Sequence, residues 1–360
     1  MGDTETVPDD AMRMPVLLTF LLVAVALDGL TAEHARTSFR AMGTRITVTA
    51  YGDDGDALGS GIQRARSAIE RRHRDWYPWR PDSELARINR QLAAGRPAQA
   101  DTELRALLRR ARTLERRSGG RFNPTIGELV QLWGFDQPPP YESPPPTRRE
   151  IRAWKARRPS LTDLDLQGQR IRSTNRALQL DLGGIAKGAA VAAGLEALRD
   201  VGAGAALINA GGDVAGYGTK AGERWRIGIR DPRNGVLAAL ELDGDEAVFS
   251  SGDYERYRES EDGDRRGHVL NPHTGYPAEG AIHATVLTTD AELADAAATA
   301  LLVAGRDHWI ATARRMGVTY ALIVDRSGSV RVSERLAERA GLEAHTDRNV
   351  VVRRLRPSAD

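Results

Sequence analysis

The chain contains no cysteine among its 360 residues. This absence excludes disulfide bridges, thiolate metal sites and a cysteine nucleophile. It also excludes a lipid-modified N-terminal cysteine, so we do not expect a lipoprotein anchor.

A strong excess of one charge sign is also missing. The sequence has 51 Lys and Arg against 49 Asp and Glu, which gives a formal net charge of +2. Arginine clusters near residues 71–74 and 109–112 are typical of solvated helix faces. Hydrophobic residues make up 41% and charged residues 28%, as in soluble globular proteins. Composition therefore predicts a folded globular protein and gives no reason to expect a nucleic-acid partner.

Near the N-terminus, an apolar run at residues 15–27 follows Arg13. The run is shorter than the roughly 20 apolar residues of a membrane span and resembles the core of a signal peptide. Leu30 stands where a cleavage site prefers a small residue. We interpret residues 1–35 as a signal peptide or an N-terminal membrane anchor, with the protein exported or tethered on the outer side of a bacterial membrane. A buried first helix is the alternative.

Several widespread patterns are absent as well. No repeat of about 20–50 residues is present. No Gly-x-Ser-x-Gly elbow surrounds any serine, which argues against a hydrolase triad of Ser251, His268 and Asp253.

The remaining pattern mixes strands and helices irregularly. Alternating or apolar runs predict strands at residues 45–51, 176–181, 206–209, 225–229 and 247–250, and helical spacing predicts helices at 60–74, 83–91, 101–118, 189–201 and 291–304. Six prolines at residues 137–147 predict an exposed loop. The mixture favours the α+β class. We expect one catalytic domain at residues 36–355 and a tail at 356–360.

The first segment with chemical potential is LDLGGIAKG at residues 180–188, which passes from a predicted strand into a helix. Paired glycines let backbone amides approach a ligand, and a helix start attracts anions. Lys187 adds a cation one turn later. The spacing is not that of a P-loop, so a simple tight turn is the competing interpretation.

Three further segments contain polar residues in turns or on one helix face. The run NAGGD at residues 209–213 follows an apolar strand, and a structural turn is its competing interpretation. Hydroxyls, histidines and aromatics concentrate at residues 250–257 and 268–275, in turn-rich loops where chemistry tends to occur. Asp295 and Thr299 lie four residues apart, on one face of a helix of small apolar residues. Carboxylate and hydroxyl oxygens suit Mg²⁺, although a local ion pair or cap could also explain Asp295.

In order and content, these segments together resemble the FAD:protein FMN transferase family, known as the ApbE family. The resemblance also includes Met42-Gly43-Thr44, RPDSEL at residues 80–85, and FNPTIG at 122–127 leading to LWGF at 132–135. It covers roughly 280 residues and implies a single catalytic unit of mixed sheets and helices, related to the T-fold.

The resemblance implies a site for FAD as substrate and for Mg²⁺. FAD would contact Met42, Trp79, Arg121, Phe122, Asn123, Asp181, Lys187 and the backbone near Leu270. The metal would bind Asp295, Thr299 and a main-chain oxygen near Gly184. Trp79 stands where a tyrosine is common, and Asn123 and Asn271 where aspartates are frequent.

The implied reaction moves the FMN part of FAD onto a Thr or Ser hydroxyl of another protein and releases AMP. Either Asp295, as a metal ligand, or His268 would assist removal of the hydroxyl proton. The acceptor would be an exported or membrane-bound redox protein with a short Thr/Ser motif. Alternatives are a Mg²⁺-dependent FAD pyrophosphatase, a non-catalytic flavin-binding protein, and an interaction scaffold that binds no FAD.

Overall fold

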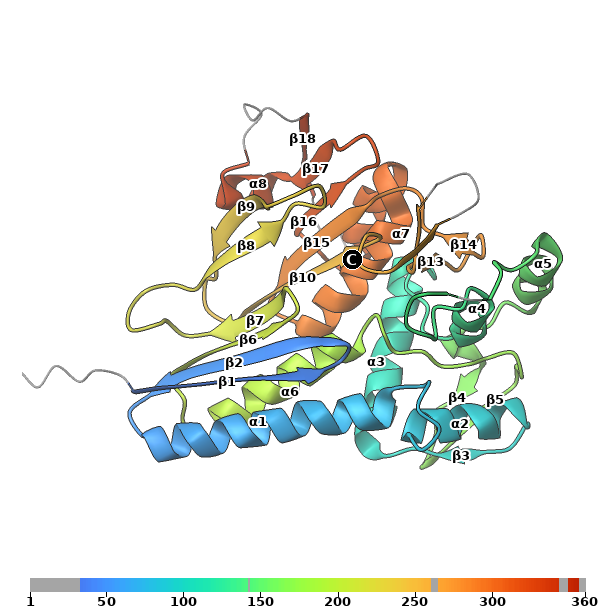
Figure 1. Cartoon of the computed structure of the whole chain (residues 1–360), viewed down its shortest axis with the longest axis horizontal. Coiled ribbons are helices and arrows are strands. Elements are labelled where there is room, and N and C mark those ends of the chain that lie inside the picture. The colour runs from blue at the N-terminus through green and yellow to red at the C-terminus, as the bar shows by residue number, and fades with distance from the viewer. Residues whose placement is uncertain (1–32, 142, 260–264, 343–348, 356–360) are drawn as a thin grey trace, which may run out of the picture. The chain divides into compact units, whose positions relative to one another are not determined.

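A computed structural model describes residues 33–141, 143–259, 265–342 and 349–355 (Figure 1). Most of the segment interpreted as a signal peptide or anchor, and the tail at 356–360, lie outside these ranges. Within them, no helix is long and apolar enough to cross a membrane.

The centre of the fold is a sheet of nine strands in the order β1-β2-β6-β7-β10-β15-β16-β17-β18, antiparallel except for its last pair. Its strands are β1 (Glu33–Ala41), β2 (Thr44–Gly52), β6 (Ala205–Ala210), β7 (Asp213–Tyr217), β10 (Glu246–Gly252), β15 (His283–Thr288), β16 (Tyr320–Val324), β17 (Val330–Ser333) and β18 (Val350–Arg353).

Four smaller sheets and eight α-helices complete the described fold. The strands are β3 (Ala98–Gln99), β4 (Leu164–Asp165), β5 (Arg170–Ser173), β8 (Arg226–Arg230), β9 (Val236–Glu241), β11 (Tyr257–Glu259), β12 (Arg265–Gly267), β13 (Leu270–Asn271) and β14 (Tyr276–Pro277). The helices are α1 (Gly55–Trp76), α2 (Glu84–Ala93), α3 (Thr102–Ser118), α4 (Gly127–Leu132), α5 (Arg148–Arg157), α6 (Ala186–Arg199), α7 (Ala291–Met316) and α8 (Glu334–Ala340), with a 3-10 turn at Leu161–Asp163.

Strand alternation separates two hydrophobic cores on the two faces of the large sheet. In β10, Ala247 and Phe249 belong to the core beneath α1, α6 and α7, whereas Val248 belongs to the core covered by β8, β9 and α8. Successive strand side chains point to opposite faces, so a strand buried on both sides reads as a continuous apolar run. Figure 1 shows α1 and α6 running side by side and α7 crossing β10 and β15.

A third, smaller core lies around α4 and α5, where Trp133, Phe135 and Trp154 are buried. The predicted proline-rich loop precedes α5, which begins after a capping box formed by Thr147 and Glu150. This capping explains why the helix starts immediately after the last proline of the loop.

The strand predicted at residues 176–181 is wrong. Only Gln179 makes a bridge, a parallel one to Ile126. The alternation itself has a physical origin, because Leu178 and Leu180 are buried. The side chain of Asn89 on α2 takes the place of a neighbouring strand: it donates to the Leu180 carbonyl (2.9 Å) and accepts from its N–H (2.8 Å).

Candidate active site

The start of α6 brings the predicted FAD segments together. The Asp181 N–H donates to the Pro124 carbonyl (2.9 Å), which joins the segment after α3 to the glycine pair. Asp181 Oδ1 accepts from the Gly183 N–H (2.8 Å). The N–H of Ala186 donates to Leu182, so several amides of this turn are used internally. The predicted anion cradle therefore offers fewer free amides than its glycines suggested.

Lys187 and Asp295 form the charged centre of the site. Lys187 Nζ pairs with Asp213, and the other Asp213 oxygen accepts from the Ser250 N–H (2.7 Å). Asp295 Oδ2 accepts from the Gly188 N–H (2.9 Å) at the start of α6, where a carboxylate is favoured by the helix dipole. We call Lys187, Asp213 and Asp295, with Ser251 and Thr299, the charged cluster.

Burial shapes the ionisation of this cluster. Desolvation raises the pKa of Asp295 to about 7, against the opposing effect of Lys187, because a buried carboxylate is costly without a cation. Burial alone would lower the pKa of Lys187, but Asp213 and Asp295 outweigh it and raise that pKa. The two carboxylates thus keep Lys187 charged, while Lys187 retains 26% side-chain exposure.

Hydroxyl oxygens of this cluster lie close to one another and to Gly184. Thr299 Oγ1 lies 3.3 Å from Ser251 Oγ, and a Cβ placed on Gly184 would lie 3.2 Å from Thr299 Oγ1. Thr299 follows Asp295 by one turn of α7. Among the described residues no group of three or more His, Cys, Asp or Glu side chains could hold a metal. A single carboxylate with hydroxyl and carbonyl oxygens suits Mg²⁺, which commonly completes its shell with substrate phosphates and water.

His268 lies in the loop before β13 and is held by the backbone of Arg256, twelve residues earlier. Its N–H donates to the Arg256 carbonyl (2.9 Å), and its Nδ1 lies 3.2 Å from the same oxygen. A carbonyl can only accept, so Nδ1 carries the proton and Nε2 keeps a free lone pair. Desolvation, then Arg256 and Lys187, lower the pKa of His268 to about 3, so the ring is neutral at neutral pH.

Other predicted FAD residues lie on separate turns of the chain. Met42 has a φ of 52° in the two-residue turn joining β1 and β2. Just after this turn, the Arg45 carbonyl accepts from the Gly211 N–H (3.1 Å). Phe122 packs against Gly184, where a Cβ would meet its ring at 3.3 Å.

Arg121 and Asn123 flank Phe122 after α3. Arg121 donates to the Ser118 carbonyl (3.3 Å), and Asn123 accepts from Thr125 (2.9 Å). Leu270 is buried in the third core, so its side chain is used in packing.

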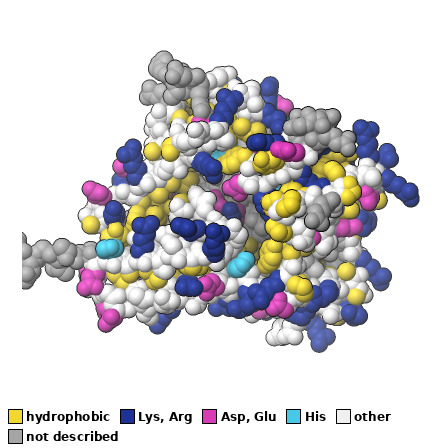
Figure 2. Space-filling view, in the orientation of Figure 1, with side chains coloured by type: hydrophobic (Ala, Val, Ile, Leu, Met, Phe, Trp, Pro, Cys, Tyr) yellow, Lys and Arg dark blue, Asp and Glu magenta, His cyan; other side chains and the backbone are white. Residues whose placement is uncertain are grey.

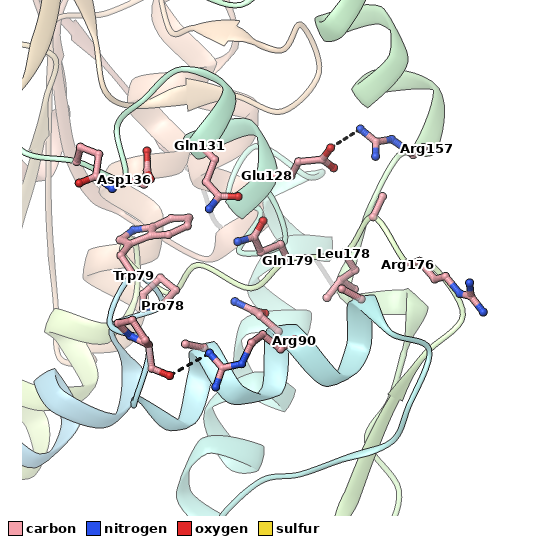
Figure 3. A pocket seen from close by; sticks show the side chains of 16 residues that line it. Pro78, Trp79, Arg90, Glu128, Gln131, Asp136, Arg157, Arg176, Leu178 and Gln179 are labelled. Atoms are coloured by element: carbon pink, nitrogen blue, oxygen red, sulfur yellow. Dashed lines mark hydrogen bonds and ion pairs between the residues drawn. The ribbon is translucent and has the colours of Figure 1, made fainter. Parts of the chain in front are cut away.

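Trp79 lies apart from the charged cluster, in the loop after α1. It lines a cavity of about 520 Å³ (Figure 3), and no other predicted site residue lines that cavity.

Three residues near the site had no assigned role in the sequence analysis: Asp213, Glu255 and Arg256. Asp213 ends the NAGGD turn and was open to a purely structural interpretation, but the structure pairs it with Lys187. Desolvation raises the pKa of Glu255, and the nearby Lys187 opposes that rise. Only tertiary contact reveals these partners, since the sequence separates them from Lys187 by 26 residues or more.

Figure 2 shows acidic side chains in a hollow near the middle of one face, with Lys and Arg around it.

The hydrolase triad is excluded by geometry. Ser251 bonds with Thr299, His268 with the Arg256 backbone, and Asp253 pairs with Arg326 at 3.7 Å. The three side chains therefore have separate partners, in keeping with the missing elbow sequence.

Comparison with known proteins agrees with this fold. The ApbE family model matches residues 42–323. The chain is 37% identical over 317 residues to an FAD:protein FMN transferase of Rhodobacter capsulatus, covering 87% of this chain and 59% of that protein. It is 33% identical to the FAD:protein FMN transferase of Treponema pallidum, covering 72% and 75%.

Solved structures are similar over most of the chain. The ApbE protein of Thermotoga maritima superposes with a TM-score of 0.78 at 30% identity, covering 86% of this chain and 99% of that one. The flavinyl transferase ApbE of Pseudomonas stutzeri has a TM-score of 0.76 at 30% identity, covering 86% and 98%. Fold and likeness together define a transferase with an α+β catalytic unit. The chain belongs to the ApbE family.

Proposed function

We propose that this protein transfers the FMN part of FAD onto a Ser or Thr hydroxyl of an acceptor protein, with Mg²⁺ as cofactor. The observation that supports it most is the convergence of Asp295 and Thr299 with Gly184 beside Lys187, at the start of α6. Relatives similar over most of the chain are named for this transfer.

The residues at the site fit a magnesium ion. Asp295 is 5% exposed, and its Oδ2 accepts from the Gly188 N–H. When bound, Mg²⁺ would neutralise pyrophosphate charge and stabilise the charge that develops as the phosphoanhydride breaks. Asp295, Thr299 and the Gly184 main chain would hold it, and Lys187 would supply a second positive charge to the phosphates.

In the transfer, the acceptor oxygen forms a bond to the FMN phosphorus while the anhydride P–O bond breaks. AMP leaves with the bridging oxygen, and the hydroxyl proton passes to a base. His268 suits this role better than Asp295, because its Nε2 is free and Asp295 is committed to a cation. The negative pyrophosphate would raise the pKa of His268 above its value in the free protein and make it a stronger base.

One experiment separates transfer from its alternatives. Purified protein is incubated with FAD, Mg²⁺ and a Thr-containing acceptor, and the products are followed by mass spectrometry. FMN mass on the acceptor with stoichiometric AMP supports transfer. Free FMN with AMP indicates a pyrophosphatase, intact bound FAD a flavin-binding protein, and no FAD binding an interaction scaffold.

The metal assignment has a direct test. Asp295→Ala should reduce both AMP release and FMN transfer by at least about 10²-fold, as expected when a group that stabilises transition-state charge is lost. Asp290→Ala is a matched control, since Asp290 caps the same helix but lies outside the charged cluster. Near-normal transfer by Asp295→Ala, together with magnesium dependence equal to wild type, would refute the assignment.

We further propose that the acceptor is an exported or membrane-bound redox protein and that transfer occurs outside the cytoplasm. The apolar run at residues 15–27 supports this location. Fractionation of cells that express the full chain tests it, and recovery only with cytoplasmic proteins would contradict it.

A further inference from the structure

The cavity beside Trp79 lies next to chain segments that lead to predicted FAD residues. Residues 176–179 line the cavity, and two residues later Asp181 accepts from the Gly183 N–H at the glycine pair. Glu128 and Gln131 on α4 also line it, and Phe122 precedes this helix by five residues. Desolvation raises the pKa of Tyr77, two residues before Trp79, and the carboxylates of Asp181 and Asp136 add to this rise. The cavity therefore lies close to Asp181, a predicted FAD residue.

The lining is polar and contains amide side chains without partners. Gln131 and Gln179 make no side-chain hydrogen bond with any part of the chain that the structure describes. Figure 3 shows both amides directed into the cavity, with the Trp79 indole at one end. The charged groups at the margin are engaged elsewhere: Arg157 pairs with Glu128 (2.7 Å), and Arg90 donates to the Pro81 carbonyl (2.9 Å).

This chemistry fits a peptide backbone better than a planar ring. Each amide side chain carries donors and an acceptor, which match the alternating N–H and C=O groups of an extended main chain. A flavin or adenine ring would require apolar contact on both faces, and among the lining residues Trp79 supplies the only aromatic face. The volume of about 520 Å³ lies within the range of specific ligand sites.

We propose that this cavity is the docking groove for the acceptor segment, with Gln131 and Gln179 bonding its main chain and Trp79 separating it from FAD. The proposal rests on the proposed transfer function. An extended segment in the groove would pass Trp79 and present its Ser or Thr hydroxyl to the charged cluster. Main-chain recognition would also let one groove accept acceptors of different sequence.

The test uses the full chain with a pooled library of short peptides, each with one central threonine. The peptide most strongly labelled by wild type is then used for kinetics. The double variant Gln131→Ala/Gln179→Ala should raise KM for that peptide about tenfold, the effect of losing two modest hydrogen bonds. Its Kd for FAD, and its AMP release without peptide, should stay within twofold of wild type. Ala177→Phe, which fills the groove, should have the same selective effect.

The matched control is Gln63→Ala, which changes an exposed glutamine on α1 that does not line the cavity and should leave all three quantities unchanged. A weaker Kd for FAD in the groove variants would show that the cavity holds part of FAD and would overturn the proposal. An unchanged peptide KM in both groove variants would overturn it too. If wild type labels no peptide at all, the proposed transfer function itself fails, and the groove proposal falls with it.

Discussion

At the scale of single residues, His283 illustrates how burial controls ionisation. Its side chain is fully buried, with Nδ1 3.1 Å from the Tyr254 hydroxyl and Nε2 2.8 Å from Thr285 Oγ1. Desolvation lowers its pKa to about 4; Asp231 opposes this shift and Arg230 adds to it. Both nitrogens are therefore engaged by hydroxyls while the ring stays neutral.

A pH dependence of stability follows. Above pH 6.5 the His283 ring is neutral in both the folded and the unfolded state. Between about pH 6.5 and 4, His283 binds a proton in the unfolded chain but not in the folded protein. The free energy of unfolding should therefore fall by about 3 kcal/mol over this range on account of His283. Urea titrations of wild type and His283→Gln at several pH values measure it. Equal slopes in the two proteins would contradict the assignment.

Gly188 sets the distance between α6 and α7. A Cβ there would lie 2.3 Å from the Ala291 carbonyl oxygen, so Gly188→Ala must push the helices apart and break the bond to Asp295. We expect a loss of about 2 kcal/mol in unfolding free energy and a larger loss of transfer activity. Gly59→Ala in α1, where a Cβ meets nothing within 4 Å, should instead stabilise by up to about 1 kcal/mol. Thermal unfolding with activity assays compares them, and an active, stable Gly188→Ala protein would disprove this packing.

At the scale of elements, α7 is longer than its sequence pattern indicated. The predicted helix ended at residue 304, whereas the structure continues to Met316 through a break at Gly305. Gly305 has φ 60° and ψ −172°, a conformation open essentially to glycine alone, and a Cβ there would lie 2.5 Å from Gly280 Cα. The predicted helix ended where α7 breaks, and the close approach of Gly280 leaves room only for glycine at that break.

Gly305→Ala should therefore cost about 3 kcal/mol or more in unfolding free energy, from strain and overlap together. Gly317→Asn is the control: Gly317 caps α7 in the left-handed region with open space around it, and asparagine tolerates that conformation. Differential scanning calorimetry measures the melting temperatures of both variants. A melting temperature for Gly305→Ala equal to that of the control would show that α7 can continue without the break.

At the scale of the whole molecule, the site joins segments that lie far apart in the sequence. The charged cluster takes residues from α6, β7, β10 and α7, all within the compact unit Ala32–Asp360. Ligands that connect these elements should stabilise the entire unit, because binding only to the folded state shifts the unfolding equilibrium.

We expect FAD at about 100 times its Kd to add roughly 2.7 kcal/mol to the unfolding free energy, with a further increase when Mg²⁺ is present. Asp295→Ala should keep most of the FAD effect and lose the magnesium increment. Thermal shift assays with FAD, with and without Mg²⁺ and a chelator, measure this. A magnesium increment retained in Asp295→Ala would place the ion elsewhere.

Some of this protein was determined by sequence alone. Apolar periodicity located helices α1, α2, α3, α6 and α7, but only strands β2, β6 and β10 of the large sheet. Asp295 and Thr299 stood on one helix face because α-helical geometry requires it. The ordered motifs predicted the ApbE family, which the comparisons confirm. The strand predicted at 176–181 failed because alternation reports burial, and here Asn89 satisfied the backbone in place of a neighbouring strand.

Other features were decided only by tertiary structure. Lys187 with Asp213, and Gly188 with Asp295, come together because β7 and α7 pack against α6. The tautomer of His268 depends on a carbonyl twelve residues away, and the cavity beside Trp79 is lined by four separate parts of the chain. A sequence pattern records which face of an element is buried. It does not record which residue, distant in the sequence, packs against that face. These long-range contacts determine the ionisation of the site residues, the position of the His268 proton and the shape of the site.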